Sequence, residues 1–282
     1  MTDELSRADL MKQAAGQELG GKAETGPEDY SLWAKFRFPG DAIFDRVKNR
    51  DRDKSQFCLD ISHHQDDDID FSQLRLANVG CLYLKASQGL HYVDKKFQPF
   101  WQAVEQLPEA ARVPLGGYHF LTEEDGAGQA AHYLDVMKSV NAPVSGNLVP
   151  VVDIEANNGV TGKDPDHWDK LSKEQIKKIL VEWLAYVESH TKTSPIIYTA
   201  PLWWDSHLGP GVPPELTRYR FWIADLGNKQ LNFESPRIPT SGTLAFWQFT
   251  WTARLENGYN KDLDASIFYG TADDLKAALV IP

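Results

Sequence analysis

The chain of 282 residues contains, near its middle, Leu148-Val149-Pro150-Val151-Val152-Asp153-Ile154-Glu155, an apolar strand that ends abruptly in two acids. Side chains alternate along a strand, so Asp153 and Glu155 should project to the same side, with Cα atoms about 6.5 to 7 Å apart. In a barrel of parallel strands, the carboxyl ends of the strands carry the chemistry. This segment therefore predicts a pair of carboxyl groups at the mouth of a barrel.

The rest of the chain shows the alternation of strand and helix patterns that such a barrel needs. From Phe57 onward, short β-branched or aromatic runs alternate with helical patterns, which is typical of βα units around a parallel sheet. The expected strands are Phe57–Ile61, Cys81–Ala86, Leu115–Phe120, Leu148–Ile154, Pro195–Thr199, Phe221–Ala224, Leu244–Phe249 and Leu263–Phe268. The later strands follow one another with fewer helical intervals. We therefore predict an α/β fold, an irregular TIM-like β/α barrel with a strand-rich second half.

The clearest helix should begin after Ser172, where Ser172-Lys173-Glu174-Gln175 has the pattern of a capping box. The apolar residues that follow fall on one helical face: Ile176, Ile179, Leu180, Trp183, Leu184 and Val187. Weaker helical patterns occupy the segments Lys95–Glu105 and Glu124–Ser139.

Two regions differ in character. Residues 1–54 are rich in charged residues and glycine, with a short aromatic patch at Tyr30, Trp33, Phe36 and Phe38. We expect an N-terminal extension that is partly ordered and docks onto the barrel, and a single catalytic barrel domain over residues 55–282, since such barrels commonly need about 250 residues.

Composition excludes several classes of function. Forty acidic residues face 29 basic ones, and the net charge is −11. Lys and Arg are scattered, which argues against a nucleic-acid partner. No segment reaches the roughly 18 apolar residues of a membrane helix, and the N-terminus lacks the apolar core of a signal peptide. We expect synthesis in the cytoplasm and no membrane insertion.

The two cysteines, Cys58 and Cys81, each stand inside an apolar run. We expect both to be free thiols buried in strands, with no disulfide framework.

Asp153 and Glu155 alone are weak evidence for catalysis, because acids at strand ends often cap a helix or pair with a lysine. Repetition strengthens the functional interpretation: Asp60 ends a second apolar strand, and Asp264 precedes Ile267-Phe268-Tyr269. Acids at one mouth shift one another's pKa values, as acid/base catalysis requires. Glycoside cleavage needs one protonated carboxyl group to donate to the leaving oxygen and another group to stabilise positive charge at the anomeric carbon.

Aromatic residues stand near the ends of other strands: Tyr118, Phe120, Tyr198, Trp222 and Trp247. Core packing explains any single one of them. As a group, among nine tryptophans and ten tyrosines, they suit a carbohydrate cleft, because sugar C–H faces stack on aromatic rings.

Other chemistries find little support. His63 and His64 beside the run Asp66-Asp67-Asp68 suggest a metal site at first. Adjacent histidines, however, should point to opposite sides of a strand, and a run of Asp is usually a solvated loop, so we do not expect one. The chain has no Gly-x-Ser-x-Gly motif and no glycine-rich phosphate loop. We predict no metal and no cofactor.

Eight short motifs, read in order, resemble glycoside hydrolase family 25, the Chalaropsis-type lysozymes. They are Leu59-Asp60-Ile61-Ser62-His63-His64-Gln65, Tyr83-Leu84-Lys85-Ala86-Ser87-Gln88-Gly89, Gly117-Tyr118-His119-Phe120, Val152-Asp153-Ile154-Glu155, Ile197-Tyr198-Thr199, Phe221-Trp222-Ile223-Ala224, Trp247-Gln248-Phe249-Thr250 and Asp262-Leu263-Asp264. The resemblance spans about residues 56–270.

The resemblance implies hydrolysis of the β-1,4 bond between N-acetylmuramic acid and N-acetylglucosamine in peptidoglycan. Glu155 would be the general acid, Asp153 would orient the substrate acetamide or stabilise the charged intermediate, and Asp60 and Asp264 would complete the acidic floor. The implied substrate-binding residues are Lys85, Tyr118, Phe120, Tyr198, Trp222, Trp247 and Gln248. Attack by the substrate's own acetamide and attack by water both stay open.

This chain departs from the family in two places. Members commonly carry an acid where it has Gln88, and an aromatic residue where it has Asp225-Leu226. Both positions lie outside the acid pair, so we expect an altered subsite preference before any loss of activity.

A catalytically silent barrel that binds glycan or a protein is the alternative, although a binder has no reason to keep four acids. For delivery to the cell wall, an exported antibacterial effector with a cognate immunity protein is preferred over a phage-type endolysin, because the N-terminal extension could serve for loading.

Overall fold

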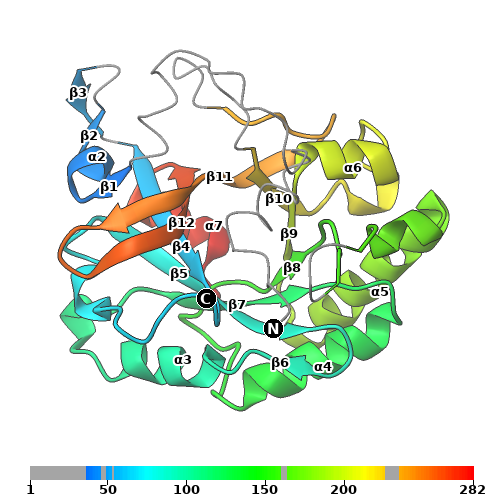
Figure 1. Cartoon of the computed structure of the whole chain (residues 1–282), viewed down its shortest axis with the longest axis horizontal. Helices are drawn as coiled ribbons and strands as arrows, with labels where there is room; N and C mark the ends of the chain where they lie inside the picture. Colours follow the sequence, from blue (N-terminus) through cyan, green and yellow to red (C-terminus); the bar gives the residue numbers. More distant parts are fainter. Residues whose placement is uncertain (1–35, 46–48, 53, 160–163, 226–234) are drawn as a thin grey trace.

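A closed barrel of eight strands forms the centre of the molecule. The computed structural model describes residues 36–45, 49–52, 54–159, 164–225 and 235–282. The barrel strands, in spatial order, are β4 (Ser55–Ile61), β5 (Val79–Gln88), β7 (Leu115–Phe120), β8 (Val151–Asp153), β9 (Ile196–Thr199), β10 (Arg220–Ala224), β11 (Thr243–Leu255) and β12 (Tyr259–Tyr269). β4 to β11 run parallel, whereas β12 is antiparallel to both β11 and β4 and closes the barrel (Figure 1). The predicted irregular β/α barrel is confirmed.

All eight expected strands are present; β7 has the expected bounds, and the others differ in length. β8 covers only Val151–Asp153 instead of Leu148–Ile154; Pro150 has no N–H to donate to a neighbouring strand, which shortens the ladder. β11 and β12 are longer than expected, at 13 and 11 residues, and form one hairpin. This hairpin accounts for the strand-rich second half.

Helices cover the outside of the barrel on the side of β5 to β10 (Figure 1). They are α3 (Phe97–Glu105), α4 (Gly126–Lys138), α5 (Lys173–Thr191) and α6 (Pro201–His207), and α7 (Ala272–Leu279) follows the last strand. Short elements complete the connections: η3 (Phe71–Gln73), β6 (Tyr92–Val93), η4 (Glu109–Ala111), η5 (His167–Lys170) and η6 (Pro214–Leu216). None of the described helices has both the length and the apolar character that crossing a bilayer requires.

The predicted capping box begins α5. Ser172 Oγ accepts a hydrogen bond from the Gln175 backbone N–H, and Gln175 Oε1 accepts one from the Ser172 N–H. Of the six apolar positions expected on one face, five are buried and Ile179 is half-buried. α5 packs on α4 through Trp183, whose ring lies 5.4 Å from the Tyr133 ring.

The described residues before the barrel pack against it. β1 (Arg37–Phe38) pairs in parallel with β11, and the Phe36 ring lies 4.9 Å from the Phe249 ring and 5.3 Å from the Phe57 ring. α2 (Gly40–Ile43) and the small ladder of β2 (Phe44–Asp45) with β3 (Arg50–Asp51) follow. Tyr30 and Trp33 of the expected aromatic patch lie outside the described residues.

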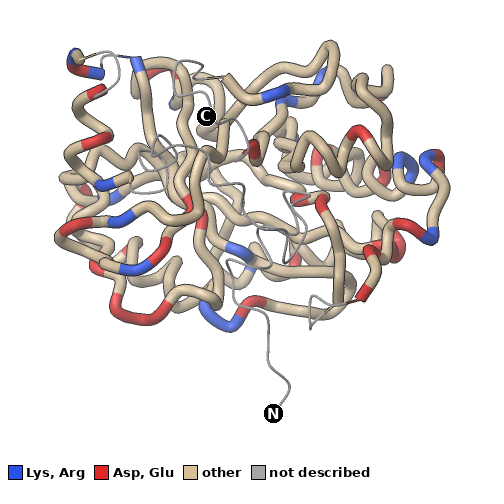
Figure 2. The backbone as a smooth tube through the Cα atoms, turned by 45° about the horizontal axis from the view of Figure 1, so that its top comes forward, with Lys and Arg blue, Asp and Glu red and all other residues tan. Residues whose placement is uncertain are grey.

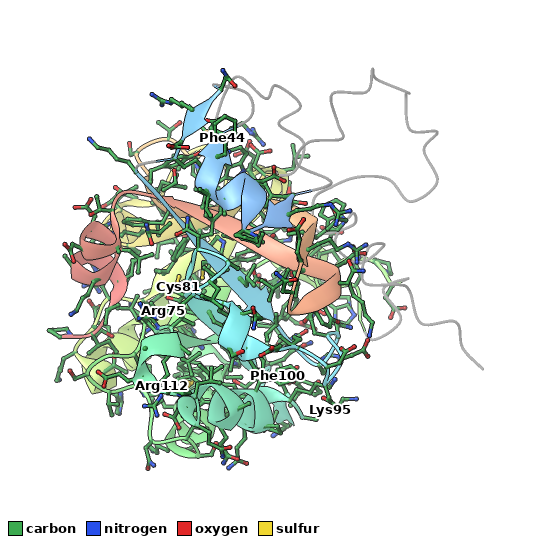
Figure 3. The ribbon with its side chains drawn as sticks, turned by 90° about the vertical axis from the view of Figure 1, so that its left-hand side faces the viewer. Phe44, Arg75, Cys81, Lys95, Phe100 and Arg112 are labelled. Atoms are coloured by element: carbon green, nitrogen blue, oxygen red, sulfur yellow. The ribbon has the colours of Figure 1, made fainter. Side chains whose placement is uncertain are left out.

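The two cysteines are free and buried, as predicted. Cys58 on β4 and Cys81 on β5 are register partners in the barrel wall, and Figure 3 labels Cys81. Over the described part of the chain, the charged positions are spread along the trace instead of gathering in one basic stripe (Figure 2).

Glycine makes room for the aromatic centre of the barrel. Tyr83 is fully buried, its ring lies 5.1 Å from that of Trp222, and its hydroxyl donates to the Val149 carbonyl at 3.0 Å. A Cβ atom at Gly116 on β7 would stand 2.3 Å from Tyr83 Cε1 and 2.9 Å from Leu148 Cβ. The Gly116-Gly117 pair in β7 is thus a packing requirement.

Gly116→Ala should destabilise the fold by about 2 kcal/mol or more, because the added methyl group overpacks a closed core. Urea unfolding of Gly116→Ala measures the loss. Gly40→Ala is the matched control, since a Cβ at this exposed position meets no atom within 4 Å. Equal stability of the two variants would contradict the role of Gly116, and Tyr83→Leu in the Gly116→Ala background should recover part of the loss.

Candidate active site

A cavity of about 590 Å³ opens at the carboxyl end of the parallel strands. Residues from seven barrel strands and their following loops line it: Asp60, Ser62, His63, His64, Lys85, Gln88, Tyr92, Tyr118, Phe120, Thr122, Glu123, Glu124, Val151, Asp153, Glu155, Ala156, Asn157, Asn158, Gly159, His167, Tyr198, Trp222 and Asp264. Its place agrees with the general rule for barrels, in which loops after the strands build the site.

All four predicted acids lie together in this cavity. Asp60 on β4 and Asp264 on β12 are register partners across the antiparallel pair, and Asp153 on β8 is a register partner of both Phe120 and Tyr198. Their exposed fractions are 8% for Asp60, 3% for Asp264, 6% for Asp153 and 9% for Glu155, so the carboxyl groups are buried against the wall of the cavity. The expected same-side projection of the Asp-x-Glu pair is confirmed.

Burial governs the ionisation of the central pair. It raises the pKa of Glu155 to about 7; Lys85 opposes the rise, while the Asp60 and Asp166 carboxylates add to it. Burial, with the negative charge of Glu155, also raises the pKa of Asp153 well above its usual range, again against Lys85. Asp153 Oδ1 and Glu155 Oε2 have no hydrogen-bond partner among the described protein groups. The pair therefore keeps a proton near neutral pH.

Backbone contacts fix the direction of these acids. Trp168, fully buried on η5, donates its indole N–H to the Glu155 carbonyl at 3.0 Å. The Ile154 N–H donates to the Tyr198 carbonyl at 2.9 Å, and the Leu121 N–H donates to the Asp153 carbonyl at 2.8 Å. The end of β8 is thus held on both sides.

Asp60 is held from beneath. Gln248 Nε2 donates to Asp60 Oδ2 at 3.1 Å, and the Tyr198 hydroxyl donates to Gln248 Oε1 at 2.9 Å. Gln248 is fully buried and does not line the cavity, in contrast to the expected substrate contact. In the structure, the Gln248 side chain contacts Asp60 instead.

Four expected aromatic residues line the cavity: Tyr118, Phe120, Tyr198 and Trp222. Tyr118 and Phe120 are half-buried and present ring surface, whereas Tyr198 and Trp222 are buried and form the floor. Trp247 is the exception, since it lies outside the lining and donates its indole N–H to the Asp225 carbonyl at 3.0 Å. β11 places this side chain away from the cavity.

His119, between Tyr118 and Phe120, points the other way and is buried beneath α4 and α5. Gln129 Oε1 lies 3.2 Å from His119 Nε2 and can only accept a hydrogen bond, so Nε2 carries the proton and Nδ1 accepts from Ser87 Oγ at 2.8 Å. Burial lowers the pKa of His119 to about 3. This imidazole is a neutral structural group.

Several lining residues were not predicted, most of them on loops. Glu123, after β7, contacts His167 Nδ1 at 3.0 Å and accepts from Asn157 Nδ2 at 3.0 Å, which joins two loops at one side of the cavity. At another part of the lining, Asp94 accepts from both the backbone N–H and Nδ1 of His63. Glu123 lies in the loop after β7, which ends at Phe120, so the pattern of an acid at the end of a strand does not identify it.

The histidine and aspartate run considered as a metal site is held by other contacts. The rings of His63 and His64 lie 4.1 Å apart in a turn, so they do not point to opposite sides as expected for a strand. Asp66 and Asp68 form ion pairs with Lys261.

Asp166, Asp169 and His207 also gather within metal-binding reach of one another. Asp166, however, accepts hydrogen bonds from the Asn157 N–H, the Trp168 N–H and the Trp203 indole. These contacts explain the cluster as an anchor for the loop after β8.

Comparison with known proteins agrees with the geometry. The family model described as "Glycosyl hydrolases family 25" matches residues 59–257. The chain belongs to this family. It is 28% identical over 224 residues to Lysozyme M1 of Streptomyces globisporus, a match that covers 78% of this chain and 69% of that protein.

Two solved structures support the assignment. The bacterial lysozyme from Streptomyces coelicolor superposes with a TM-score of 0.66 and 27% identity over 79% of this chain and 95% of that one. The family 25 glycosyl hydrolase from Bacillus anthracis gives a TM-score of 0.64 at 23% identity, over 79% and 93% of the two chains, and shows the shared fold. The protein is a family 25 glycoside hydrolase, a lysozyme homologue.

The raised pKa of Glu155 makes the stability of this family 25 enzyme depend on pH. Between the usual glutamate pKa and about 7, the unfolded chain has released the proton that folded Glu155 still binds, so stability falls as pH rises through this window. Glu155→Gln should remove this loss of folding stability, which amounts to as much as about 3 kcal/mol. We expect Glu155→Gln to be more stable than the wild type at pH 8 and equal to it at pH 4.

Urea unfolding at both pH values measures this difference. The matched control is Glu105→Gln on the exposed side of α3, which should change little at either pH. A stability difference between Glu155→Gln and the wild type that does not change with pH would contradict the burial of an ionisable Glu155.

Proposed function

We propose that this enzyme is a muramidase that cleaves the β-1,4 bond between N-acetylmuramic acid and N-acetylglucosamine in peptidoglycan. One observation carries the proposal: a buried carboxyl group with a pKa of about 7, Glu155, shares an open cavity with three more acids. Membership of the lysozyme family supports the substrate.

Glu155 acts as the general acid. At neutral pH its raised pKa keeps a large share of the molecules protonated, so that Glu155 can donate to the glycosidic oxygen as the bond breaks. Asp153, the last residue of β8 and two residues before Glu155, stabilises positive charge at the anomeric carbon or orients the substrate acetamide. Asp60 and Asp264 complete the acidic floor beneath the reacting sugar.

The aromatic residues bind the glycan strand. Tyr118 and Phe120 offer exposed ring surface on which the C–H faces of sugars can stack. Lys85 lies over the Phe120 ring at 4.7 Å and adds a donor at the same wall. Tyr198 and Trp222 shape the floor, with the Trp222 indole N–H donating to Ser266 Oγ at 2.9 Å.

Glu155→Gln should lower the hydrolysis of purified peptidoglycan by about 10² to 10⁴-fold, the usual contribution of a general acid. Mass spectrometry of borohydride-reduced fragments checks the bond, since a muramidase leaves muramic acid at the new reducing end. Glu105→Gln should keep wild-type activity. Fragments that end in reduced glucosamine would contradict the proposal.

A silent binding barrel makes the opposite prediction in the same assay. The wild type would then sediment with insoluble wall material and release no soluble fragments from any of several wall types. Glu155→Gln would behave as the wild type does.

We further propose that the enzyme is delivered to the wall of a competing cell as an antibacterial effector, with an immunity protein as its partner. The N-terminal extension, residues 1–54, precedes the barrel domain and would serve for loading onto an export machine. An immunity protein would enter the acidic cavity, where basic side chains could pair with the carboxylates.

Expression in the periplasm, by means of an added leader, should lyse Escherichia coli, and Glu155→Gln should not. Co-expression of the product of an adjoining gene should restore growth. A holin gene beside this one would overturn the effector role in favour of an endolysin.

A further inference from the structure

Lys85 holds the only lysine or arginine charge among the described residues that line the cavity. It faces six lining carboxyl groups, from Asp60, Glu123, Glu124, Asp153, Glu155 and Asp264. The positive charge of this single ammonium group therefore has a strong effect on the ionisation of these acids.

The ammonium group is held by an uncharged partner. Lys85 Nζ donates to Gln88 Oε1 at 2.8 Å, which is its only hydrogen bond within the part of the chain that the structure describes. It also lies over the Phe120 ring at 4.7 Å. An amide oxygen fixes the position of the ammonium group without cancelling its charge, whereas a carboxylate at the same place would form a close ion pair.

Pairing with two neighbouring strands fixes the backbone position of Gln88. Gln88 ends β5 and is a register partner of Phe120 on β7 and of Tyr92 on β6. Two neighbouring strands thus set where its side chain begins. Burial lowers the pKa of the Lys85 ammonium group, while the carboxylates of Asp153, Asp94 and Glu155 favour its charged form. The Lys85 charge acts from this fixed point on Asp153 and Glu155, and it opposes the effect of burial on both.

We propose that Gln88 is a positioning residue that sets the working pH of the acid pair, by holding the Lys85 ammonium group beside the acids while leaving its charge intact. This inference rests on the proposed function of the pair as the catalytic acids. It assigns a role to the neutral amide: the acid pair works at a lower pH than it would beside a neutralised lysine.

Gln88→Glu tests the proposal. The new carboxylate should pair with Lys85 and cancel its field, so the alkaline limb of the pH–activity profile on peptidoglycan should move up by about one pH unit. The titration of the Glu155 carboxyl carbon, followed by ¹³C NMR in glutamate-labelled protein, should move up with it. Glu155→Gln identifies the resonance.

Gln102→Glu is the matched control, since it adds the same charge on the exposed side of α3. Its profile and its Glu155 titration should coincide with those of the wild type. An equal shift in both variants would overturn the proposal, because net charge alone would then explain it.

A second variant pair tests whether Gln88 acts through Lys85. Gln88→Met removes the hydrogen-bond acceptor of Lys85 with little change in side-chain size. It should displace the alkaline limb of the pH–activity profile, and thermal unfolding of the variant should stay cooperative. In the Lys85→Met background, Gln88→Met should cause no further displacement. Additive displacements in the double variant would overturn the proposed route.

The two measurements separate the inference from the function on which it rests. If no wall preparation is hydrolysed but Gln88→Glu still raises the Glu155 titration, the proposed function fails and control of Glu155 ionisation by Gln88 stands. If hydrolysis occurs and Gln88→Glu moves neither the profile nor the titration, the function stands and the inference is overturned.

Discussion

The pairing of β12 with β4 is the contact on which the rest of the structure depends. It is one of the two antiparallel pairings that β12 makes in the barrel, it closes the sheet, and it sets Asp264 opposite Asp60. The parallel half of the barrel supplies Asp153 and Glu155, so the acidic cavity exists only when both halves have closed. Because the acids come from strands far apart in sequence, formation of the site and completion of the fold are one event.

Closing the barrel forces like charges out of water, which is costly unless protons or counter-ions compensate. This protein uses both. Protons stay on the central pair because burial raises the pKa of Glu155 and Asp153, and the single ammonium group of Lys85 limits how far the pKa values rise. Elsewhere around the cavity, Glu123 contacts His167 and Asp94 contacts His63, so further acids meet hydrogen-bond partners. The acids around the cavity are thus matched by bound protons or by partner groups.

The sequence was informative where local pattern controls structure. Alternation along β8 predicted that Asp153 and Glu155 share one side, and the capping box predicted the start of α5. Contacts made over long sequence distances were not predictable in this way. Gln248 was expected to bind substrate but reaches back 188 positions to hold Asp60, and nothing in its neighbourhood signals that partner. His63 and His64 were judged as strand residues, although they occupy a turn in which their rings meet.

The two thiols in the wall have a consequence for where the folded chain can work. Cys58 and Cys81 are neighbours across β4 and β5, both are fully buried, and burial holds the pKa of Cys58 well above its usual range. Oxidants act on accessible thiolates, and both thiols of this pair are fully buried. An envelope that oxidises exposed cysteines would leave the folded barrel unchanged, and the chain needs no disulfide-forming helper to stay folded there.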